Sequence, residues 1–135
     1  MNYIKRNLEK IVSQVTKEYP VLLVTGPRQV GKTTMLQKLM EGTDRSYVSL
    51  DDLNERSIAK TDPELFLQLH KPPVLIDEVQ YAPELFTYIK MNVDKKHEPA
   101  AFWLTGSQLF KLLQGVQESL PRRLAVRSLT SVSQP

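Results

Sequence analysis

The sequence contains no cysteine in its 135 residues, which excludes disulfide bonds and every zinc or iron–sulfur site that depends on thiolates. Histidine is scarce too: the chain has only His70 and His97, and neither has a second ligand at a metal-site spacing. No stretch approaches the roughly 18 apolar residues that a membrane span requires. The first residues also lack the apolar core of a signal peptide. We therefore expect a soluble cytoplasmic protein with no membrane segment and no histidine metal centre.

The overall composition is typical of a single globular domain, with 41% hydrophobic and 24% charged residues. The net charge of +3 is unevenly spread. Residues 1–45 carry eight Lys or Arg against four Asp or Glu, residues 46–100 carry six against ten, and residues 101–135 carry four against one. Basic ends permit a nucleic-acid partner but give it little support, because such a footprint also needs its charges on one face.

Short apolar runs alternate along the chain with stretches of helical spacing. The predicted strands cover residues 21–24, 46–50, 74–76, 101–104 and 124–129. The predicted helices cover residues 3–18, 32–40, 52–60, 63–70, the stretch from Pro83 through Val93, and residues 108–113. Strands without polar alternation are buried on both faces, so this order predicts an α/β three-layer sandwich with a parallel sheet of about five strands. We expect the domain to cover residues 1–129 and residues 130–135 to form a polar tail.

A few residues predict where these elements end and what they bury. Gly42 is expected to close the helix that precedes it. Pro63 suits the first turn of its helix, with either Asp62 or Thr61 as the N-cap. Trp103 lies within an apolar run, and we expect it in the core rather than as a platform for base stacking.

A glycine-rich segment follows the first predicted strand. Residues 26–33 read GPRQVGKT and match the phosphate-loop pattern G-x-x-x-x-G-K-[ST] in full. The glycines let the backbone present N–H groups to phosphate oxygens, and the next helix directs its N-terminal dipole at the same anion. Lys32 is expected to reach the β- and γ-phosphates, and the Thr33 hydroxyl to hold Mg²⁺. The alternative is an ordinary glycine turn with Lys32 in solvent.

Two carboxylates, Asp77 and Glu78, end the apolar run of residues 74–76. The carboxyl ends of parallel strands meet at one edge of a sheet, so we expect Asp77 near the phosphate loop, holding the Mg²⁺ shell. An adjacent glutamate suits a general base that polarises a water beside the γ-phosphate. The alternative for Glu78 is a solvated loop that caps the following helix.

Two hydroxyl residues, Thr105 and Ser107, follow the run of residues 101–104. If that strand lies between the phosphate-loop strand and the Asp77 strand, the sheet order is 5-1-4-3-2 and one hydroxyl can sense the γ-phosphate. An ordinary turn is the alternative, and the choice between the two hydroxyls stays open. The chain has neither the Asn-Lys-x-Asp motif of GTPases nor the Leu-Ser-Gly-Gly-Gln motif of ABC proteins. A small-molecule kinase would need an arginine-bearing lid that the middle of the chain barely supplies.

These segments together resemble the AAA+ (AAA plus) P-loop ATPases. More narrowly, they resemble the bacterial and archaeal group that joins an N-terminal AAA module to a C-terminal domain of nuclease-like fold. The resemblance lies in GPRQVGKTT at residues 26–34, VLIDEVQ at 74–80, PEL at 83–85 and LTGSQ at 104–108. It covers nearly all of residues 3–129.

This resemblance implies ATP and Mg²⁺ as ligands. It implies Mg²⁺ coordination by Thr33 and Asp77, hydrolysis that uses Glu78 and Lys32, and γ-phosphate sensing around Thr105 and Ser107. The implied nucleotide-binding residues are Gly26, Pro27, Arg28, Gln29, Val30, Gly31, Lys32, Thr33 and Thr34. The loop pattern allows any residue at Arg28 and Gln29, so we expect these two to contribute backbone N–H groups only.

Two features depart from the family pattern. Members continue for some hundreds of residues with a lid and a C-terminal domain, so we expect this chain to be a truncated or degenerate copy without the lid. Where relatives read Ser-Leu-Ala-Gly-Arg, residues 119–123 read SLPRR. Arg123 takes the place of the arginine that acts at a neighbour's nucleotide, which makes residues 119–127 a candidate for self-association. Pro121 and Arg122 restrict the backbone there, so a solvated or sheet-flanking Arg123 is the alternative.

The sequence thus favours one function and leaves two others open. The favoured function is Mg²⁺-dependent ATP binding with hydrolysis by an AAA-type core. The first alternative is a non-catalytic ATP-binding switch or interaction module. The second alternative is a fragment of a nucleic-acid-linked motor, which only the basic ends and the family analogy support.

Overall fold

The chain folds around a five-stranded sheet, seen in a computed structural model that describes residues 9–10, 12–14, 17–27, 31–107 and 123–128. Residues 9–10 and 12–14 are helical and precede the sheet. The elements that follow are β1 (Val21–Thr25), α2 (Lys32–Leu39), β2 (Ser46–Ser49), α3 (Leu53–Thr61), α4 (Pro63–Leu69), β3 (Val74–Asp77), the 3-10 helix η2 (Val79–Tyr81), α5 (Leu85–Lys96), β4 (Phe102–Gly106) and β5 (Leu124–Ser128).

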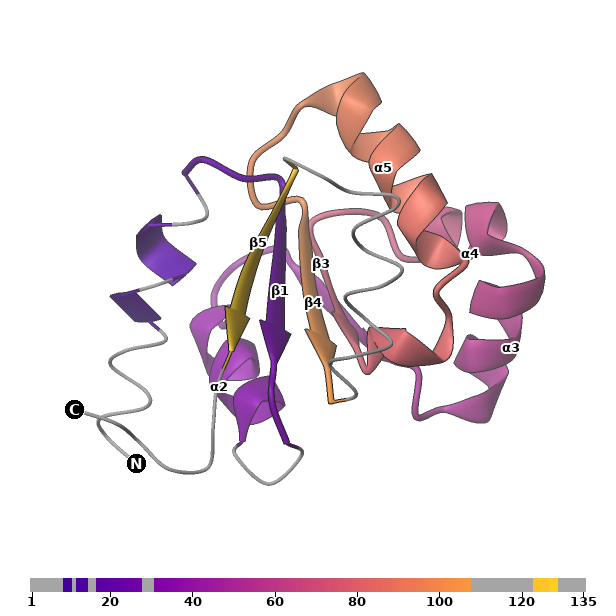
Figure 1. The fold of residues 1–135 in the computed structure, drawn as a ribbon, viewed down its shortest axis with the longest axis horizontal. Coiled ribbons are helices and arrows are strands. Elements are labelled where there is room, and N and C mark those ends of the chain that lie inside the picture. The colour runs from indigo at the N-terminus through magenta and orange to yellow at the C-terminus, as the bar shows by residue number, and fades with distance from the viewer. Residues whose placement is uncertain (1–8, 11, 15–16, 28–30, 108–122, 129–135) are drawn as a thin grey trace.

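All five strands run parallel, in the order β2-β3-β4-β1-β5. This confirms the predicted α/β class and the predicted order 5-1-4-3-2, which is the same order counted from the other edge. In β1, Val21 lies opposite Phe102 of β4 on one side and Leu124 of β5 on the other. The carboxyl ends of the strands therefore share one edge, the lower edge in Figure 1, where β1 ends and α2 begins.

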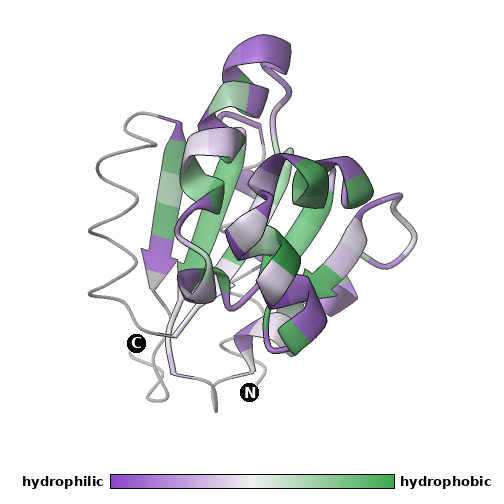
Figure 2. Ribbon diagram, turned by 90° about the vertical axis from the view of Figure 1, so that its right-hand side faces the viewer, coloured by the Kyte–Doolittle hydropathy of each residue, from purple (hydrophilic) through white to green (hydrophobic). Residues whose placement is uncertain are grey.

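Helices cover both faces of the sheet (Figure 1): α2 and the N-terminal helical residues lie on one face, and α3, α4 and α5 on the other. Leu22 and Val24 of β1 belong to a smaller hydrophobic cluster with Leu36 of α2. Val21 and Leu23, which alternate with them, belong to the larger cluster. In Figure 2 the inner strands are mainly green, as expected of strands that are buried on both faces.

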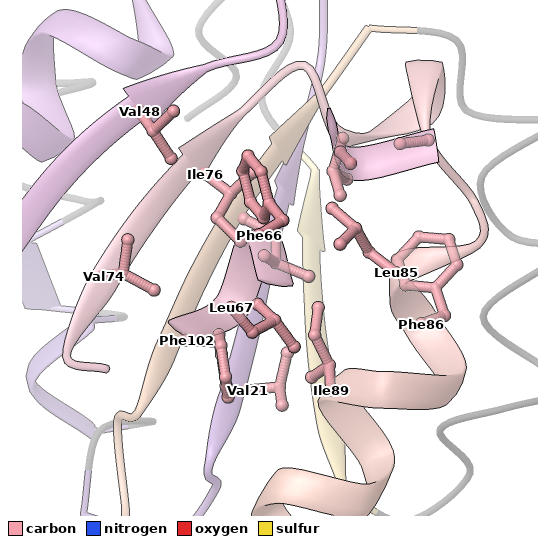
Figure 3. Packing of buried hydrophobic residues seen from close by; sticks show 14 of the residues in the cluster. Val21, Val48, Phe66, Leu67, Val74, Ile76, Leu85, Phe86, Ile89 and Phe102 are labelled. Atoms are coloured by element: carbon pink, nitrogen blue, oxygen red, sulfur yellow. The ribbon is translucent and has the colours of Figure 1, made fainter. Parts of the chain in front are cut away.

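The larger cluster packs α4 and α5 against the sheet (Figure 3). Phe66 of α4, Ile89 of α5 and Ile76 of β3 belong to it, and each is 0% exposed. Full burial of an aliphatic or aromatic side chain contributes about 1.5–3 kcal/mol. This cluster fixes β3, and with it the position of the residues that follow β3 at the carboxyl edge.

One arginine closes the amino edge of the sheet. Nη2 of Arg45 donates to the Ala100 carbonyl at 2.7 Å, and Nη1 lies 3.3 Å from the Val74 carbonyl and 3.4 Å from that of Ala101. Its guanidinium carbon lies 4.0 Å from the centre of the Trp103 ring. Burial lowers the pKa of Arg45 to about 10. Trp103 is 5% exposed, so the prediction that it belongs to the core is confirmed.

Four strands end at a different residue from the prediction, and β1 and β3 each run one residue further than expected, to Thr25 and Asp77. β4 extends two residues further than expected, because Thr105 and Gly106 pair with Val24 and Thr25 of β1. Thr105 is therefore a buried strand residue, and an ordinary turn at this position is wrong. β2 ends at Ser49, one residue earlier than predicted.

The helix predicted from Pro83 begins later than expected. α5 starts at Leu85 and runs to Lys96, and η2 precedes it. The intervening residues form a turn, in which the N–H groups of Leu85 and Phe86 donate to the carbonyls of Ala82 and Pro83 at 3.0 and 3.1 Å. The apolar spacing alone did not separate this turn from the helix.

Two other helix ends can be compared with the predictions. α2 ends at Leu39 with Met40 as its C-cap, so Gly42, at φ +81°, lies beyond the cap. Asp62, and not Thr61, caps α4, and its carboxylate accepts a hydrogen bond from the N–H of Leu65 at 3.1 Å.

Five predicted segments lie wholly or partly outside the described residues: the helices of residues 3–18 and 108–113, the self-association segment of residues 119–127, the strand of residues 124–129 at its last residue, and the tail of residues 130–135. Within the described ranges, none of the helices has the length and apolar character needed to cross a membrane.

The packing of α4 predicts that two neighbouring substitutions differ greatly in their effect on the free energy of unfolding. We expect Phe66→Ala to lower the free energy of unfolding by about 3–5 kcal/mol, because it leaves a cavity in the larger cluster. Leu65→Ala on the same helix is the matched control, since Leu65 is 41% exposed. Its effect should stay within about 0.5 kcal/mol. Urea denaturation measures both, and equal losses would contradict the assigned role of the larger cluster.

Candidate nucleotide-binding site

The described residues at the two ends of the segment between β1 and α2 have backbone conformations that suit a phosphate loop. Gly31 caps α2 with φ +77°, a left-handed conformation that glycine adopts without a steric penalty. The Gly31 carbonyl accepts the first bond of the helix, from the N–H of Met35 at 3.0 Å. At the other end of the loop, the N–H of Gly26 donates to the Gly106 carbonyl of β4 at 3.2 Å. Residues 28–30, which include the predicted Arg28, Gln29 and Val30, lie outside the described residues.

Lys32 begins α2 and is only 1% exposed, which is unusual for a lysine. Its Nζ lies 3.7 Å from Oε2 of Glu78, and both side chains are almost fully buried. A buried ammonium needs a compensating negative charge. The alternative that Lys32 lies in solvent is therefore wrong.

Asp77, the last residue of β3, lies at the centre of a hydrogen-bond cluster. Its Oδ1 accepts a hydrogen bond from Thr33 Oγ1 at 2.6 Å and another from Thr105 Oγ1. Its Oδ2 accepts from the Tyr47 hydroxyl and from Ser49 Oγ, each at 3.2 Å. The four donors come from α2, β4 and β2, so this one carboxylate connects three elements around β3.

Glu78 follows Asp77 in a left-handed backbone conformation, with φ +58°. It is 3% exposed and makes no side-chain cap bond to η2, so the alternative of a solvated capping loop is wrong. Its Oε1 accepts hydrogen bonds from Gln80 Nε2 at 2.8 Å and from Ser107 Oγ at 3.0 Å. Its N–H donates to Thr105 Oγ1 at 2.9 Å. The two predicted hydroxyl residues therefore both lie at the site, Thr105 beside Asp77 and Ser107 beside Glu78.

Sequence reasoning missed the polar residues of β2 and η2 at this site. Ser49 pairs in register with Asp77, so the parallel pairing of β2 with β3 brings Tyr47 and Ser49 to the same carboxylate. Their spacing of two along a strand was a usable signal, because such residues share a face. Gln80, which is 8% exposed, gave no comparable signal, since its position depends on the short η2 turn.

The acidic groups at this edge fit a hard divalent cation. Carboxylate oxygens of Asp51, Asp77 and Glu78 all lie within 4.8 Å of one another. Carboxylate and hydroxyl oxygens are the ligands that Mg²⁺ prefers, and Thr33 supplies the hydroxyl. Of the described histidines, neither joins this group, and His70 instead lies 2.8 Å from Glu55.

Arg123 lies at the opposite edge of the sheet, just before β5. Its carbonyl accepts a hydrogen bond from the N–H of Val21, the first residue of β1, at 3.3 Å. Its Nε donates to Asp94 Oδ1 of α5 at 2.5 Å, and this hydrogen bond lowers the pKa of Asp94. Arg123 therefore lies at the edge of the sheet opposite to the described residues of the phosphate loop.

A family model described as an AAA domain matches residues 18–135. The chain belongs to this AAA domain family. The AAA domain is a P-loop NTPase domain, and nucleotide binding is the property that the family implies. Two curated relatives, the uncharacterized proteins Rv2008c of Mycobacterium tuberculosis and Mb2031c of Mycobacterium bovis, are each 34% identical over 115 residues. The match covers 84% of this chain and 26% of each relative, so this AAA domain spans about a quarter of their length.

Solved structures share the fold of this AAA domain at low sequence identity. A Walker-type ATPase of Pyrococcus abyssi has a TM-score of 0.62 at 18% identity, covering 94% of this chain and 52% of that one. The P-loop NTPase domain of the sigma-54 transport activator from E. coli has a TM-score of 0.60 at 12% identity, covering 92% and 94%. The RuvB Holliday junction branch migration motor of Thermotoga maritima has a TM-score of 0.56 at 17% identity, covering 96% and 45%.

The hydrogen bond from Tyr47 to Asp77 predicts a coupled titration. Burial raises the pKa of the Tyr47 phenol, and the negative charge of Asp77 raises it further. Asp77→Asn should therefore move the pKa of Tyr47 down toward its ordinary value, because the charge is gone. Ultraviolet absorbance of the phenolate measures this change, and subtracting the titration of Tyr47→Phe isolates the one tyrosine. A Tyr47 pKa that is the same with Asp and with Asn at position 77 would contradict the described contact.

Proposed function

We propose that this AAA domain binds ATP together with Mg²⁺ and hydrolyses the bond to the γ-phosphate. One observation carries the proposal: the Thr33–Asp77 hydrogen bond and the Lys32–Glu78 pair adjoin each other at the carboxyl edge of the sheet. Ligands of open α/β sheets bind at this edge. Family membership supports nucleotide binding, and the proposal adds the choice of ATP, the cation and the reaction.

In this proposal the triphosphate is bound by Lys32 and by the backbone of residues 26–34. Lys32 already compensates one carboxylate in a buried setting. A triphosphate carries more negative charge than a carboxylate, so we expect Lys32 to exchange Glu78 for phosphate oxygens when ATP binds. This exchange would also free Oε2 of Glu78 for another partner.

The residues that would hold Mg²⁺ are Thr33 and Asp77, with Asp51 beside them. A bound divalent cation neutralises charge on the phosphate oxygens and stabilises the transferred group. Tyr47 and Ser49 donate to Oδ2 of Asp77 and so limit the rotation of its carboxylate. Asp77 is thus oriented before any ligand arrives.

Glu78 is proposed to be the general base. It would accept a proton from a water whose oxygen bonds to the γ-phosphorus, while the bond from that phosphorus to the β–γ bridging oxygen breaks. Ser107 and Thr105 lie next to Glu78 and Asp77, where a hydroxyl can respond to the γ-phosphate. Backbone N–H groups and Lys32 would stabilise the charge that develops on the phosphate oxygens.

A non-catalytic ATP-binding module is the second candidate, and one observation favours it. Glu78 is occupied on both oxygens, since Oε1 accepts from Gln80 and Ser107 while Oε2 faces Lys32. A carboxylate held in this way acts as a base only after a partner moves. Turnover by the isolated chain separates the two candidates.

Several finer expectations from the sequence stay predictions. Arg123 would reach a nucleotide only in a second copy of the chain, through the predicted self-association of residues 119–127. A C-terminal nuclease-like domain in longer relatives, a missing lid, a cytoplasmic location and a nucleic-acid partner also stay predictions.

The role of Lys32 predicts a loss of affinity in Lys32→Ala. Loss of a charge-assisted contact to phosphate costs about 1.5–3 kcal/mol, which weakens Kd by roughly 10- to 150-fold. Calorimetric titration with Mg-ATP measures this change, with Mg-GTP and ADP as comparisons. Lys38→Ala is the matched control, because Lys38 is an exposed lysine of the same helix. Equal affinities of wild type and Lys32→Ala would contradict the proposed phosphate site.

The role of Glu78 predicts that hydrolysis is lost while binding is kept. Glu78→Gln removes the base but keeps the size of the side chain, so phosphate release should fall by about 10²–10⁴-fold. The Kd for Mg-ATP should change by less than about threefold, since the base contributes little to ground-state binding. Glu84→Gln, at an exposed glutamate that pairs with Lys60, should turn over like wild type. Wild-type release no faster than that of Glu78→Gln would remove hydrolysis from the proposed function.

A further inference from the structure

We infer that Gln80 is the positioning residue of Glu78: its amide nitrogen holds the Glu78 carboxylate in place when Ser107 changes partner. The inference rests on the proposed function, in which Glu78 is the base and one of the two hydroxyls responds to the γ-phosphate, and it takes Ser107 as that hydroxyl. Gln80 itself touches neither nucleotide nor water in this role, and it acts through the carboxylate that it orients.

The three side chains form a closed triangle of hydrogen bonds. Gln80 Nε2 donates to Glu78 Oε1 at 2.8 Å and to Ser107 Oγ at 3.2 Å. Ser107 Oγ donates its one hydrogen to the same Glu78 Oε1 at 3.0 Å. An ionised carboxylate can only accept, so the nitrogen of the Gln80 amide, and not its oxygen, must face Glu78. Both hydrogens of that nitrogen are thereby used.

This triangle has a consequence when ATP binds. If the Ser107 hydroxyl turns to donate to a γ-phosphate oxygen, Glu78 Oε1 loses one of its two donors. Gln80 Nε2 still donates to Oε1, so the carboxylate keeps its orientation while Oε2 exchanges Lys32 for the attacking water. Without Gln80, the turn of the Ser107 hydroxyl toward the γ-phosphate would leave Oε1 without either donor of the triangle.

Burial and backbone geometry indicate that Gln80 is held for this contact rather than for stability. Gln80 is 8% exposed, and its buried Oε1 has no hydrogen-bond partner among the residues that the structure describes. An unpaired buried acceptor destabilises the fold, and an apolar residue of similar size would avoid this cost. The left-handed conformation of Glu78 and the η2 turn place Gln80 back beside the carboxylate two residues before it. A strained backbone that serves a local contact of this kind is typical of functional sites.

The test compares Gln80→Leu with wild type in steady-state ATP hydrolysis and in calorimetric binding of Mg-ATP. Leucine keeps much of the packing volume but donates no hydrogen bond. We expect kcat to fall about tenfold or more, but by no more than the loss that removal of the base causes, while KM and Kd stay within about twofold. Gln68→Leu, the same substitution at an exposed site on α4, is the control and should behave as wild type. If Gln80→Leu does not fold, Gln80→Met, which keeps the length of the side chain and has no hydrogen-bond donor, replaces it.

A double-mutant cycle with Glu78→Gln distinguishes positioning from a separate role. If Gln80 acts through Glu78, adding Gln80→Leu to Glu78→Gln should lower the residual kcat by less than twofold. A kcat of Gln80→Leu within twofold of wild type, alongside an inactive Glu78→Gln, would overturn this inference and leave the proposed function standing. A parallel rise in KM and Kd without a change in kcat would overturn it too. Wild-type turnover no faster than that of Glu78→Gln would end both.

Discussion

The structure depends on one carboxylate, Asp77, which accepts hydrogen bonds from Thr33 and Thr105 on one oxygen and from Tyr47 and Ser49 on the other. These donors lie on α2, β4 and β2, so the contacts join the phosphate-loop helix to the middle of the sheet. A buried carboxylate costs free energy unless it is well hydrogen-bonded, and four donors meet that need. The same contacts orient the oxygens toward the place where a cation and a triphosphate would lie.

This convergence follows from the parallel sheet. With all strands in one direction, the last residues of β1, β2, β3 and β4 lie at one edge of the sheet. The two hydrophobic clusters hold the sheet from both faces and fix the register that places Ser49 opposite Asp77. Core packing thus determines the site geometry, although no core residue belongs to the site. Arg45 completes the arrangement at the other edge, where its guanidinium binds strand-end carbonyls.

Much of this was predictable from the sequence, because the informative features are local. The phosphate loop, the apolar strands and the acidic end of β3 are contiguous patterns, and the fold class and strand order predicted from them are confirmed. Features that depend on tertiary pairing were not predicted. The extension of β4 through Thr105 requires the register with β1, and the contacts of Tyr47 require that β2 pairs with β3. Gln80 reaches Glu78 only through the η2 turn, which hydrophobic spacing does not indicate.

The central claim is that Asp77 and the phosphate-loop helix form one ligand site. A crystal structure of the chain with Mg²⁺ and a non-hydrolysable ATP analogue tests this most directly. We expect one ion held between the Thr33 hydroxyl, the Asp77 carboxylate and the phosphates, with Lys32 on the β- and γ-phosphate oxygens. An analogue bound away from residues 26–34, or an ion that Asp77 does not approach, would contradict it.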